Sequence, residues 1–285
     1  MTPLYKINFP RSNVWAKLES QNPTGTHKDR SMKPWIEYYL ARGIKEFAIS
    51  SSGNSAISAA KFCAENSLRL HVFVSPDIDR AKMSALQGNP SVVLYVSKTP
   101  RKDSLQYCKK SASTNLRAST DDNALVGYQD IALELIQQLP SIDNIFIPVS
   151  SGATLEGMYL GYRRRGTNTP RLFAVQTTKV HPIASYFDRD FTSEKTSHAR
   201  AIVDNVAHRR DRVIKIIEET GGGGFVISTK ELEEAKKILG KVGWQSALAF
   251  AGFLKWSRFA RSGEARQTQN TRKKADRVSV CIFTD

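Results

Sequence analysis

The chain has 285 residues, with 42 lysines and arginines against 27 aspartates and glutamates, so its formal net charge is +15. Hydrophobic residues make up 40% and charged residues 24%, which is typical of a folded globular protein and excludes a mainly disordered one. No segment approaches the roughly 20 apolar residues of a membrane-spanning helix, and the N-terminal segment MTPLYKINFPRSNVW lacks the apolar core of a secretory signal. We therefore expect a soluble, cytoplasmic protein with no membrane partner.

Short β-branched runs alternate with longer segments of helical periodicity along the chain. Several of the runs are continuously apolar, as strands buried on both faces of a parallel sheet are. The alternation predicts an α/β fold with open, mostly parallel sheets, in which ligands bind at the carboxyl ends of strands. The predicted strands are 14–18, 46–49, 70–74, 91–96, 144–149, 171–176, 225–227 and 278–283, and the predicted helices include 54–65, 123–138, 209–219, 230–239 and 246–259.

The first chemically rich junction is LESQNPTGTHKDR, where a strand ends, a Pro-Thr-Gly turn follows and a helix begins near Thr26. Lys28 then lies in the first helical turn, where the partial positive charge of the helix N-terminus disfavours its protonated form. A neutral lysine amine is a nucleophile, so Lys28 is a candidate for covalent chemistry. The alternative is a capped helix start with a surface Lys-Asp-Arg triplet. His27 points about 100° away from Lys28 around the helix, and we interpret it as a packing or capping residue.

Two further junctions join a strand to a helix through small hydroxyl residues. In ISSSGNSA, hydroxyl groups and free N–H groups at the helix start form a candidate site for a carboxylate or phosphate, with a serine-rich N-cap as the alternative. In IPVSSGATLEG, the same kind of turn predicts a phosphate site, although no Gly-Lys-Ser/Thr follows as in a Walker loop. The run Gly221–Gly224 follows a helix and precedes a strand, so we interpret it as a helix C-cap and flexible connection.

Cysteine, histidine and basic residues carry weaker signals. Cys63, Cys108 and Cys281 have no metal-binding spacing and are interpreted as reduced thiols, and the histidines have no metal-ligand spacing, so no metal site is expected. The basic clusters match no nucleic-acid-binding motif. We expect solvated basic surface and no specific nucleic-acid binding, with 258–274 as the best candidate for a loop that faces a polyanion.

The three junctions, in this order and at these separations, resemble the fold-type II pyridoxal-phosphate enzymes, the superfamily of the tryptophan synthase β-subunit, cysteine synthases, dehydratases and threonine synthases. NPTGTHKDR and SSSGNSAISAA are most similar to the lysine motif and the substrate-carboxylate loop of threonine synthases. The similarity extends over nearly the whole chain. It implies two open parallel-sheet α/β domains, a small one at 44–126 inserted in a larger one at 1–43 and 127–285, with the cofactor, pyridoxal 5′-phosphate, between them. It also implies a homodimer.

The resemblance implies a role for each matching residue. Lys28 would carry the cofactor as a Schiff base and act as the catalytic base, and Asn54 would bind the cofactor's 3′-oxygen. Thr284 would face the pyridine nitrogen, where a neutral hydroxyl suits elimination and replacement chemistry. The substrate carboxylate would be held by Ser51, Ser52, Gly53, Asn54 and Ser55, and the cofactor phosphate by Ser150, Ser151, Gly152, Ala153 and Thr154.

The implied activity is a carbon–oxygen lyase reaction on an amino-acid substrate, most similar to threonine synthase, which converts O-phosphohomoserine and water into threonine and phosphate. Arg30, Lys61 and Lys82 are candidates to bind a dianionic substrate by charge alone. The alternatives are a serine/threonine dehydratase or another β-replacement enzyme of the same fold and, from another class, a catalytically reduced binding protein with a basic, polyanion-facing surface. Two departures from the family bear on the substrate: the turn at 150–154 has fewer glycines, and 241–247 lacks an acidic residue before its Ser-Ala pair.

Overall fold

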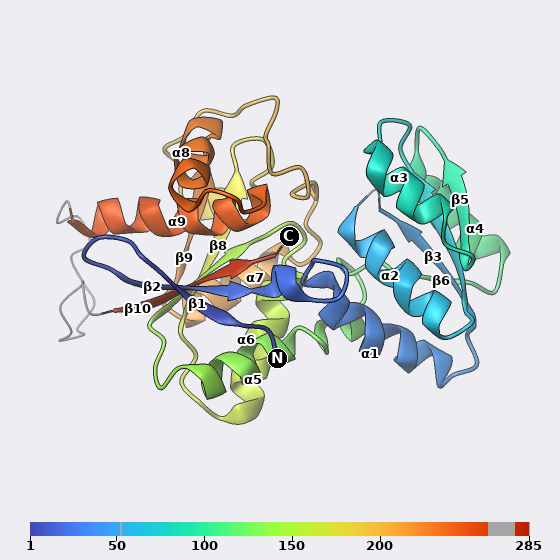
Figure 1. Cartoon of the computed structure of the whole chain (residues 1–285), viewed down its shortest axis with the longest axis horizontal. Helices are drawn as coiled ribbons and strands as arrows, with labels where there is room; N and C mark the ends of the chain where they lie inside the picture. Colours follow the sequence, from blue (N-terminus) through green and yellow to red (C-terminus); the bar gives the residue numbers. More distant parts are fainter. Residues whose placement is uncertain (52, 262–276, 285) are drawn as a thin grey trace. The chain divides into compact units, whose positions relative to one another are not determined.

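The computed structural model describes residues 1–51, 53–261 and 277–284. The chain forms two compact units, one from Met1–Ser20 with Gln129–Asp285 and the other from Gln21–Tyr128. We call them the six-stranded unit and the four-stranded unit after their sheets. Each sheet is mainly parallel and carries helices (Figure 1), so the predicted α/β class with two open parallel sheets is confirmed.

The six-stranded unit has the strand order β1-β2-β10-β7-β8-β9. All neighbours are parallel except β1 and β2, which form an antiparallel hairpin at one edge. The central helix α9 (Trp244–Arg261) packs on β7, β8, β9 and β10 and buries the apolar core of this unit. The strands are β1 (Leu4–Ile7), β2 (Asn13–Leu18), β7 (Asn144–Pro148), β8 (Arg171–Thr177), β9 (Gly223–Ile227) and β10 (Val278–Phe283), and the other helices are η1 (Glu19–Gln21), α5 (Gln129–Gln138), α6 (Ala153–Arg165), η3 (Ala184–Tyr186), α7 (Arg210–Glu219) and α8 (Thr229–Leu239).

The four-stranded unit has the parallel strand order β5-β4-β3-β6. Its core includes Trp35 and Ile36 of α1, so α1 belongs to this unit, whereas the sequence boundary at residue 44 assigned it to the other domain. Asp121 accepts hydrogen bonds from Trp35 Nε1 (2.6 Å) and from Tyr39 Oη (2.7 Å), and burial together with this hydrogen bond raises the pKa of Tyr39 to about 12. The elements are α1 (Lys28–Leu40), β3 (Glu46–Ser50), α2 (Asn54–Glu65), β4 (Arg69–Val74), α3 (Arg80–Gln87), β5 (Val92–Val96), α4 (Pro100–Lys110), β6 (Thr114–Asn115) and η2 (Asp122–Leu125).

Two sequence predictions, the helix 123–138 and the flexible connection 221–224, are wrong at closely packed glycines. The predicted helix 123–138 is divided into η2 and α5, because Gly127 lies so close to α1 that a Cβ there would be 1.7 Å from the Arg30 carbonyl oxygen. At 221–224, Gly221 follows α7 with a φ of +64°, as a C-cap does, but the last two glycines belong to β9. A Cβ at Gly222 would lie 1.9 Å from the Leu172 carbonyl oxygen, so tight packing, and not a flexible connection, requires this glycine.

The remaining sequence expectations on the fold have mixed outcomes. Every predicted strand is present within one or two residues, whereas β1, β6, α3 and α4 were not predicted. Most of the basic run 258–274 lies outside the described residues. Among the residues that are described, no helix is both long enough and apolar enough to cross a membrane.

A buried ionic network holds the edge hairpin of the six-stranded unit to α5. Lys17 is fully buried in β2, and its ammonium group donates to Glu134, to the Gln138 side-chain oxygen (2.9 Å) and to the Thr2 carbonyl oxygen (2.8 Å). Glu134 also accepts a hydrogen bond from the Thr2 backbone N–H at 3.0 Å. A buried ammonium group is tolerated only when such partners replace its water shell.

We therefore expect Glu134→Ala to lower the free energy of unfolding by about 3 kcal/mol, because it leaves Lys17 charged and buried without its carboxylate. Glu37→Ala is the matched control, since the Lys33–Glu37 pair is exposed on both sides and contributes less than about 1 kcal/mol. Urea unfolding followed by circular dichroism measures both. Equal losses for the two variants would contradict the role assigned to the network.

Candidate active site

Lys28 stands at the first position of α1, two residues after the predicted helix start. The preceding turn is closed by Asp29, whose carboxylate accepts from the Thr24 backbone N–H (2.7 Å) and hydroxyl (2.5 Å). Asp29 is thus engaged with the turn, and Lys28 forms no ion pair with any carboxylate of the described residues. The amine of Lys28 is therefore held at a helix N-terminus without a counter-charge.

Tyr128 is the side chain that the structure brings to the Lys28 amine. The Tyr128 hydroxyl lies 3.5 Å from Lys28 Nζ, and the amine sits 5.7 Å from the centre of the tyrosine ring. Tyr128 is almost completely buried, and the His27 ring packs against it with ring centres 5.6 Å apart. The prediction that His27 packs is confirmed, while its side chain makes no capping hydrogen bond.

The Ser-Gly-Asn segment connects β3 to α2 in the same unit. Gly53 occupies the N-cap position of α2 and has no side chain to cap it, and Ser51 Oγ accepts from the Gly53 backbone N–H at 3.3 Å. Among the described residues no other side chain accepts from the first N–H groups of this 12-residue helix. Asn54 and Ser55 are half-buried in the first turn. Ser52 lies outside the described residues.

Helices α1 and α2 pack side by side (Figure 1). Each helix of an α/β unit runs antiparallel to its adjacent strand, so α1 before β3 and α2 after it run in the same direction. Lys28 and the Ser-Gly-Asn segment, which begin the two helices, consequently lie toward the same end of the four-stranded unit.

Of the three cations that charge alone suggested, Lys82 of α3 is the one found at the Ser-Gly-Asn segment. A Cβ at Gly53 would lie 3.6 Å from Lys82 Nζ, and the ammonium group forms no ion pair within the described part of the chain. Lys61, by contrast, is exposed on α2 and pairs with Glu65 at 2.6 Å, which raises the pKa of Lys61. Arg30 lies in the first turn of α1. The segment therefore combines a free helix N-terminus with one available ammonium group.

The second turn that the sequence predicts to bind an anion lies in the six-stranded unit, between β7 and α6. Gly152 has a φ of +95°, and a Cβ there would lie 2.6 Å from a methyl carbon of Val213, so only glycine fits. Ser150 Oγ accepts from the backbone N–H groups of Val203 (3.1 Å) and Asp204 (3.2 Å), which leaves its own O–H free to donate. The first backbone N–H groups of α6 lack partners within the helix, as at any helix start. The turn is thus a constrained cradle for an anion.

A buried ion pair between Arg209 and Glu156 packs against this turn. Glu156, in the first turn of α6, accepts from Arg209 at 2.9 Å and from Arg212 at 2.8 Å. Arg209 is only 1% exposed, and its Cβ lies 3.6 Å from the Cβ position of Gly152. The sequence predicts that the basic clusters are solvated surface, and for Arg209 of the cluster 209–212 that prediction is wrong, because Glu156 compensates its burial.

Thr284 is brought to the same edge as the turn by strand pairing. β10 and β7 are parallel neighbours in the register Cys281↔Phe146, so the ends of both strands lie together. Thr284 follows β10 directly and is buried, and the 150–154 turn follows β7. The sheet therefore gathers all the predicted residues of this unit at one place.

The described residues fit a cofactor that carries an aldehyde and a phosphate. An aldehyde requires a primary amine that is not paired with a carboxylate, which Lys28 supplies, and a phosphate requires N–H and O–H donors at a helix start, which 150–154 supply. Two further functional candidates emerge from the structure. No sequence pattern singled out Tyr128, which is 100 residues from Lys28, and charge alone ranked Lys82 no higher than Arg30 and Lys61.

Comparison with known proteins gives a family. A family model for pyridoxal-phosphate dependent enzymes matches residues 1–272. The chain is 24% identical over 268 residues to a threonine synthase of Methanocaldococcus jannaschii, with 84% of this chain and 64% of that protein covered. It is 23% identical over 249 residues to the catabolic L-threonine dehydratase TdcB of Staphylococcus aureus, with 84% and 71% covered. This chain thus spans less than two thirds of the length of that threonine synthase.

A solved structure shares the fold at low sequence identity. The processed form of threonine deaminase isoform 2 from Solanum lycopersicum superposes with a TM-score of 0.80 at 18% identity, covering 99% of this chain and 78% of that chain. At this identity the likeness concerns the fold alone. Together with the family match over nearly the whole sequence, it confirms the resemblance to fold-type II enzymes. The chain belongs to the pyridoxal-phosphate dependent enzyme family, and its cofactor is pyridoxal 5′-phosphate.

Proposed function

We propose that the protein is an elimination and replacement enzyme whose substrate is O-phosphohomoserine, which it converts with water into threonine and phosphate. The observation that carries the choice of substrate is Lys82 Nζ beside Gly53. An ammonium group without an acidic partner at a carboxylate-binding helix start suits a substrate with a second negative charge. The similarity to a threonine synthase supports the same choice.

Each anion of the substrate has a partner in this proposal. The N–H groups that begin α2, with the side chains of Ser51, Asn54 and Ser55, bind the α-carboxylate. Ser52 and Gly53 complete this segment. Lys82 binds the phosphate on the side chain, and as a compact point charge it can follow the phosphate as it leaves.

The cofactor has its own set of residues in the proposal. Lys28 bonds it covalently, Asn54 binds its 3′-oxygen, and Thr284 faces the pyridine nitrogen with a neutral hydroxyl. Its phosphate is bound by the hydroxyls and backbone N–H groups of Ser150, Ser151, Gly152, Ala153 and Thr154. When bound, the cofactor supplies an electron sink for the carbanion that forms at the substrate α-carbon.

Lys28 also moves protons. Once the substrate amine has replaced Lys28 on the cofactor, the Lys28 amine is free to accept the α-proton as a general base. The buried hydroxyl of Tyr128, 3.5 Å away, accepts or donates one hydrogen bond and orients that amine for the transfer. Loss of a proton from the β-carbon then lets phosphate leave from the γ-carbon. The γ-carbon gains a proton and water adds at the β-carbon, so that threonine keeps its amino group.

A serine/threonine dehydratase is the second candidate, because the S. aureus dehydratase is almost as similar to this chain. A dehydratase releases ammonia and a keto acid and needs no second cation. Phosphate release from O-phosphohomoserine separates the two reactions, and ammonia release from threonine identifies the second.

The role of Lys28 is tested by the visible absorption of the purified protein with pyridoxal phosphate. We expect wild type to show the absorption band of covalently bound cofactor, and Lys28→Ala to lose both the band and the activity. Lys33→Ala, an exposed residue of the same helix, should keep both. Absence of the band from wild type would leave the catalytically reduced binding protein as the better description, and its polyanion affinity would then fall steeply with salt.

The role of the 150–154 turn is tested at Gly152. Gly152→Ala combines a strained positive φ with a collision against Val213, so we expect it to cost about 3 kcal/mol of stability and to weaken cofactor affinity at least tenfold. Gly166→Ala, at the other end of the same helix, has a φ of +70° but open space, and should cost about 1 kcal/mol with no change in cofactor affinity. Urea unfolding and cofactor titration measure the two effects. Unchanged cofactor affinity in Gly152→Ala would remove the turn from the site.

The choice of substrate is tested at Lys82. We expect Lys82→Gln to raise the KM for O-phosphohomoserine roughly 10- to 100-fold, which corresponds to a lost charge-assisted hydrogen bond of about 1.5–3 kcal/mol. Binding of an amino acid without a phosphate should change little. Lys61→Gln is the control, because that lysine is paired with Glu65 on the exposed part of α2. If Lys61→Gln and Lys82→Gln behave alike, the phosphate is bound elsewhere.

A further inference from the structure

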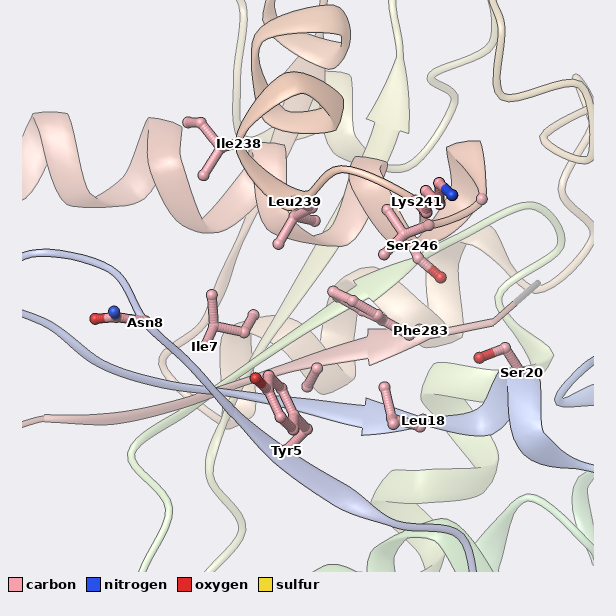
Figure 2. A pocket seen from close by; sticks show the side chains of 13 residues that line it. Tyr5, Ile7, Asn8, Leu18, Ser20, Ile238, Leu239, Lys241, Ser246 and Phe283 are labelled. Atoms are coloured by element: carbon pink, nitrogen blue, oxygen red, sulfur yellow. The ribbon is translucent and has the colours of Figure 1, made fainter.

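The six-stranded unit contains a pocket that none of the proposed cofactor or substrate residues lines. Its volume is about 740 Å³, within the range of roughly 300–1,000 Å³ typical of small-molecule sites. It lies between the edge hairpin β1–β2 with the end of β10 on one side and the connection from α8 to α9 on the other (Figure 2).

The strand register explains why the sheet leaves a hollow here. Tyr5 pairs with Ala16, and Ala16 pairs with Cys281, so these side chains share one face of the sheet. Leu18 and Phe283 form the next row on the same face. Ala16 contributes only a methyl group to this face, and Gly243 on the opposite wall contributes no side chain, so the space between the walls stays unfilled.

The floor of the pocket is apolar. Figure 2 shows Ile7, Leu239 and Phe283 pointing into the space from the three surrounding elements. Ile7 and Phe283 are buried, at 7% and 4% exposure, and Leu239 packs on the same core cluster. Exposed Tyr5 and Ile238 stand at the rim, at 64% and 50% exposure. The hydrocarbon part of a ligand would therefore replace water along this apolar floor.

The charged residue that lines the pocket is positive. Lys241 lines the pocket, no carboxylate does, and within the described residues Lys241 takes part in no ion pair or hydrogen bond. The connection that carries it is held in place by Lys236, which donates to the Gly240 carbonyl oxygen at 3.1 Å and to that of Val242. The backbone of the connection is thus held in place, and the exposed ammonium group of Lys241 is available to an anionic headgroup at the mouth of an apolar pocket.

We propose that this pocket binds a small aliphatic monocarboxylate, with its carboxylate at Lys241 and its hydrocarbon chain against Ile7, Leu239 and Phe283. A simple carboxylate matches the lining better than an α-amino acid does, because the ammonium group of an amino acid would find no acidic partner here. The proposal is independent of the reaction assigned to Lys28, since none of these residues belongs to that site.

The test is isothermal titration of the cofactor-loaded protein with octanoate, butanoate, octylamine and 2-aminooctanoate. We expect octanoate to bind, octylamine and 2-aminooctanoate to bind far more weakly, and affinity to fall about fourfold for each methylene removed between octanoate and butanoate. Lys241→Gln should weaken octanoate binding about five- to tenfold. Lys237→Gln, an exposed lysine of α8 that does not line the pocket, should leave it unchanged.

Three results would overturn the proposal. Octylamine binding as tightly as octanoate, or equal effects of the two lysine variants, would mean general adsorption to apolar surface. Displacement of octanoate by O-phosphohomoserine or threonine would assign the pocket to the substrate site. Loss of octanoate binding as the protein self-associates at high concentration would assign it to a contact with a second copy of the chain. Because octanoate binding does not require Lys28, Lys28→Ala should retain it even if the proposed reaction is wrong.

Discussion

The parallel pairing of β10 between β2 and β7 is the constraint on which the arrangement of the six-stranded unit depends. Because the three strands run in the same direction, whatever follows them in sequence emerges at one edge. The Ser150–Thr154 turn follows β7, Thr284 follows β10, and η1 follows β2. Segments separated by more than 100 residues along the chain are thus directed by backbone hydrogen bonds, before any side chain contributes.

The sequence was informative where one physical signal dominated locally. Continuous apolar runs predicted the buried parallel strands, and small hydroxyl residues after a strand predicted the junctions at which α2 and α6 begin. Helices α3 and α4 were not predicted because they bury little: Leu86 of α3 and Ser104 of α4 are their only buried residues. Without a buried apolar face, periodicity is weak.

Local sequence patterns could not predict the contacts between segments that are distant along the chain. Tyr128 reaches Lys28 across 100 residues because Gly127 lets the chain pass directly over the Arg30 carbonyl oxygen. Lys82 reaches Gly53 only because α3 packs on α2. The burial of Arg209 likewise depends on a carboxylate 53 residues earlier, Glu156. In each case the decisive partner is defined by the fold and not by neighbouring residues.

Within the described residues, cations in the interior of this protein are paired with carboxylates, whereas lysines at the candidate sites are not. The buried cations Lys17 and Arg209 are each matched by a carboxylate, as the cost of burying an isolated charge requires. Lys28, Lys82 and Lys241 have no such carboxylate among the described residues. An unpaired cation beside a helix start or an apolar pocket retains its full attraction for an incoming anion, so these three are the lysines whose surroundings suit ligands.

The last two residues of the described chain show how one strand can serve two purposes. Phe283, the last residue of β10, lines the pocket on the α9 side, whereas the buried Thr284 directly after it does not line the pocket. A ligand in the pocket would contact Phe283 but could reach Thr284 only through the backbone that joins them. Any influence of such a ligand on the cofactor would therefore come from a shift of β10, whose position is fixed by hydrogen bonds to β2 and β7 on both sides. This rigidity favours independent sites, in which the pocket binds without changing the chemistry at Lys28.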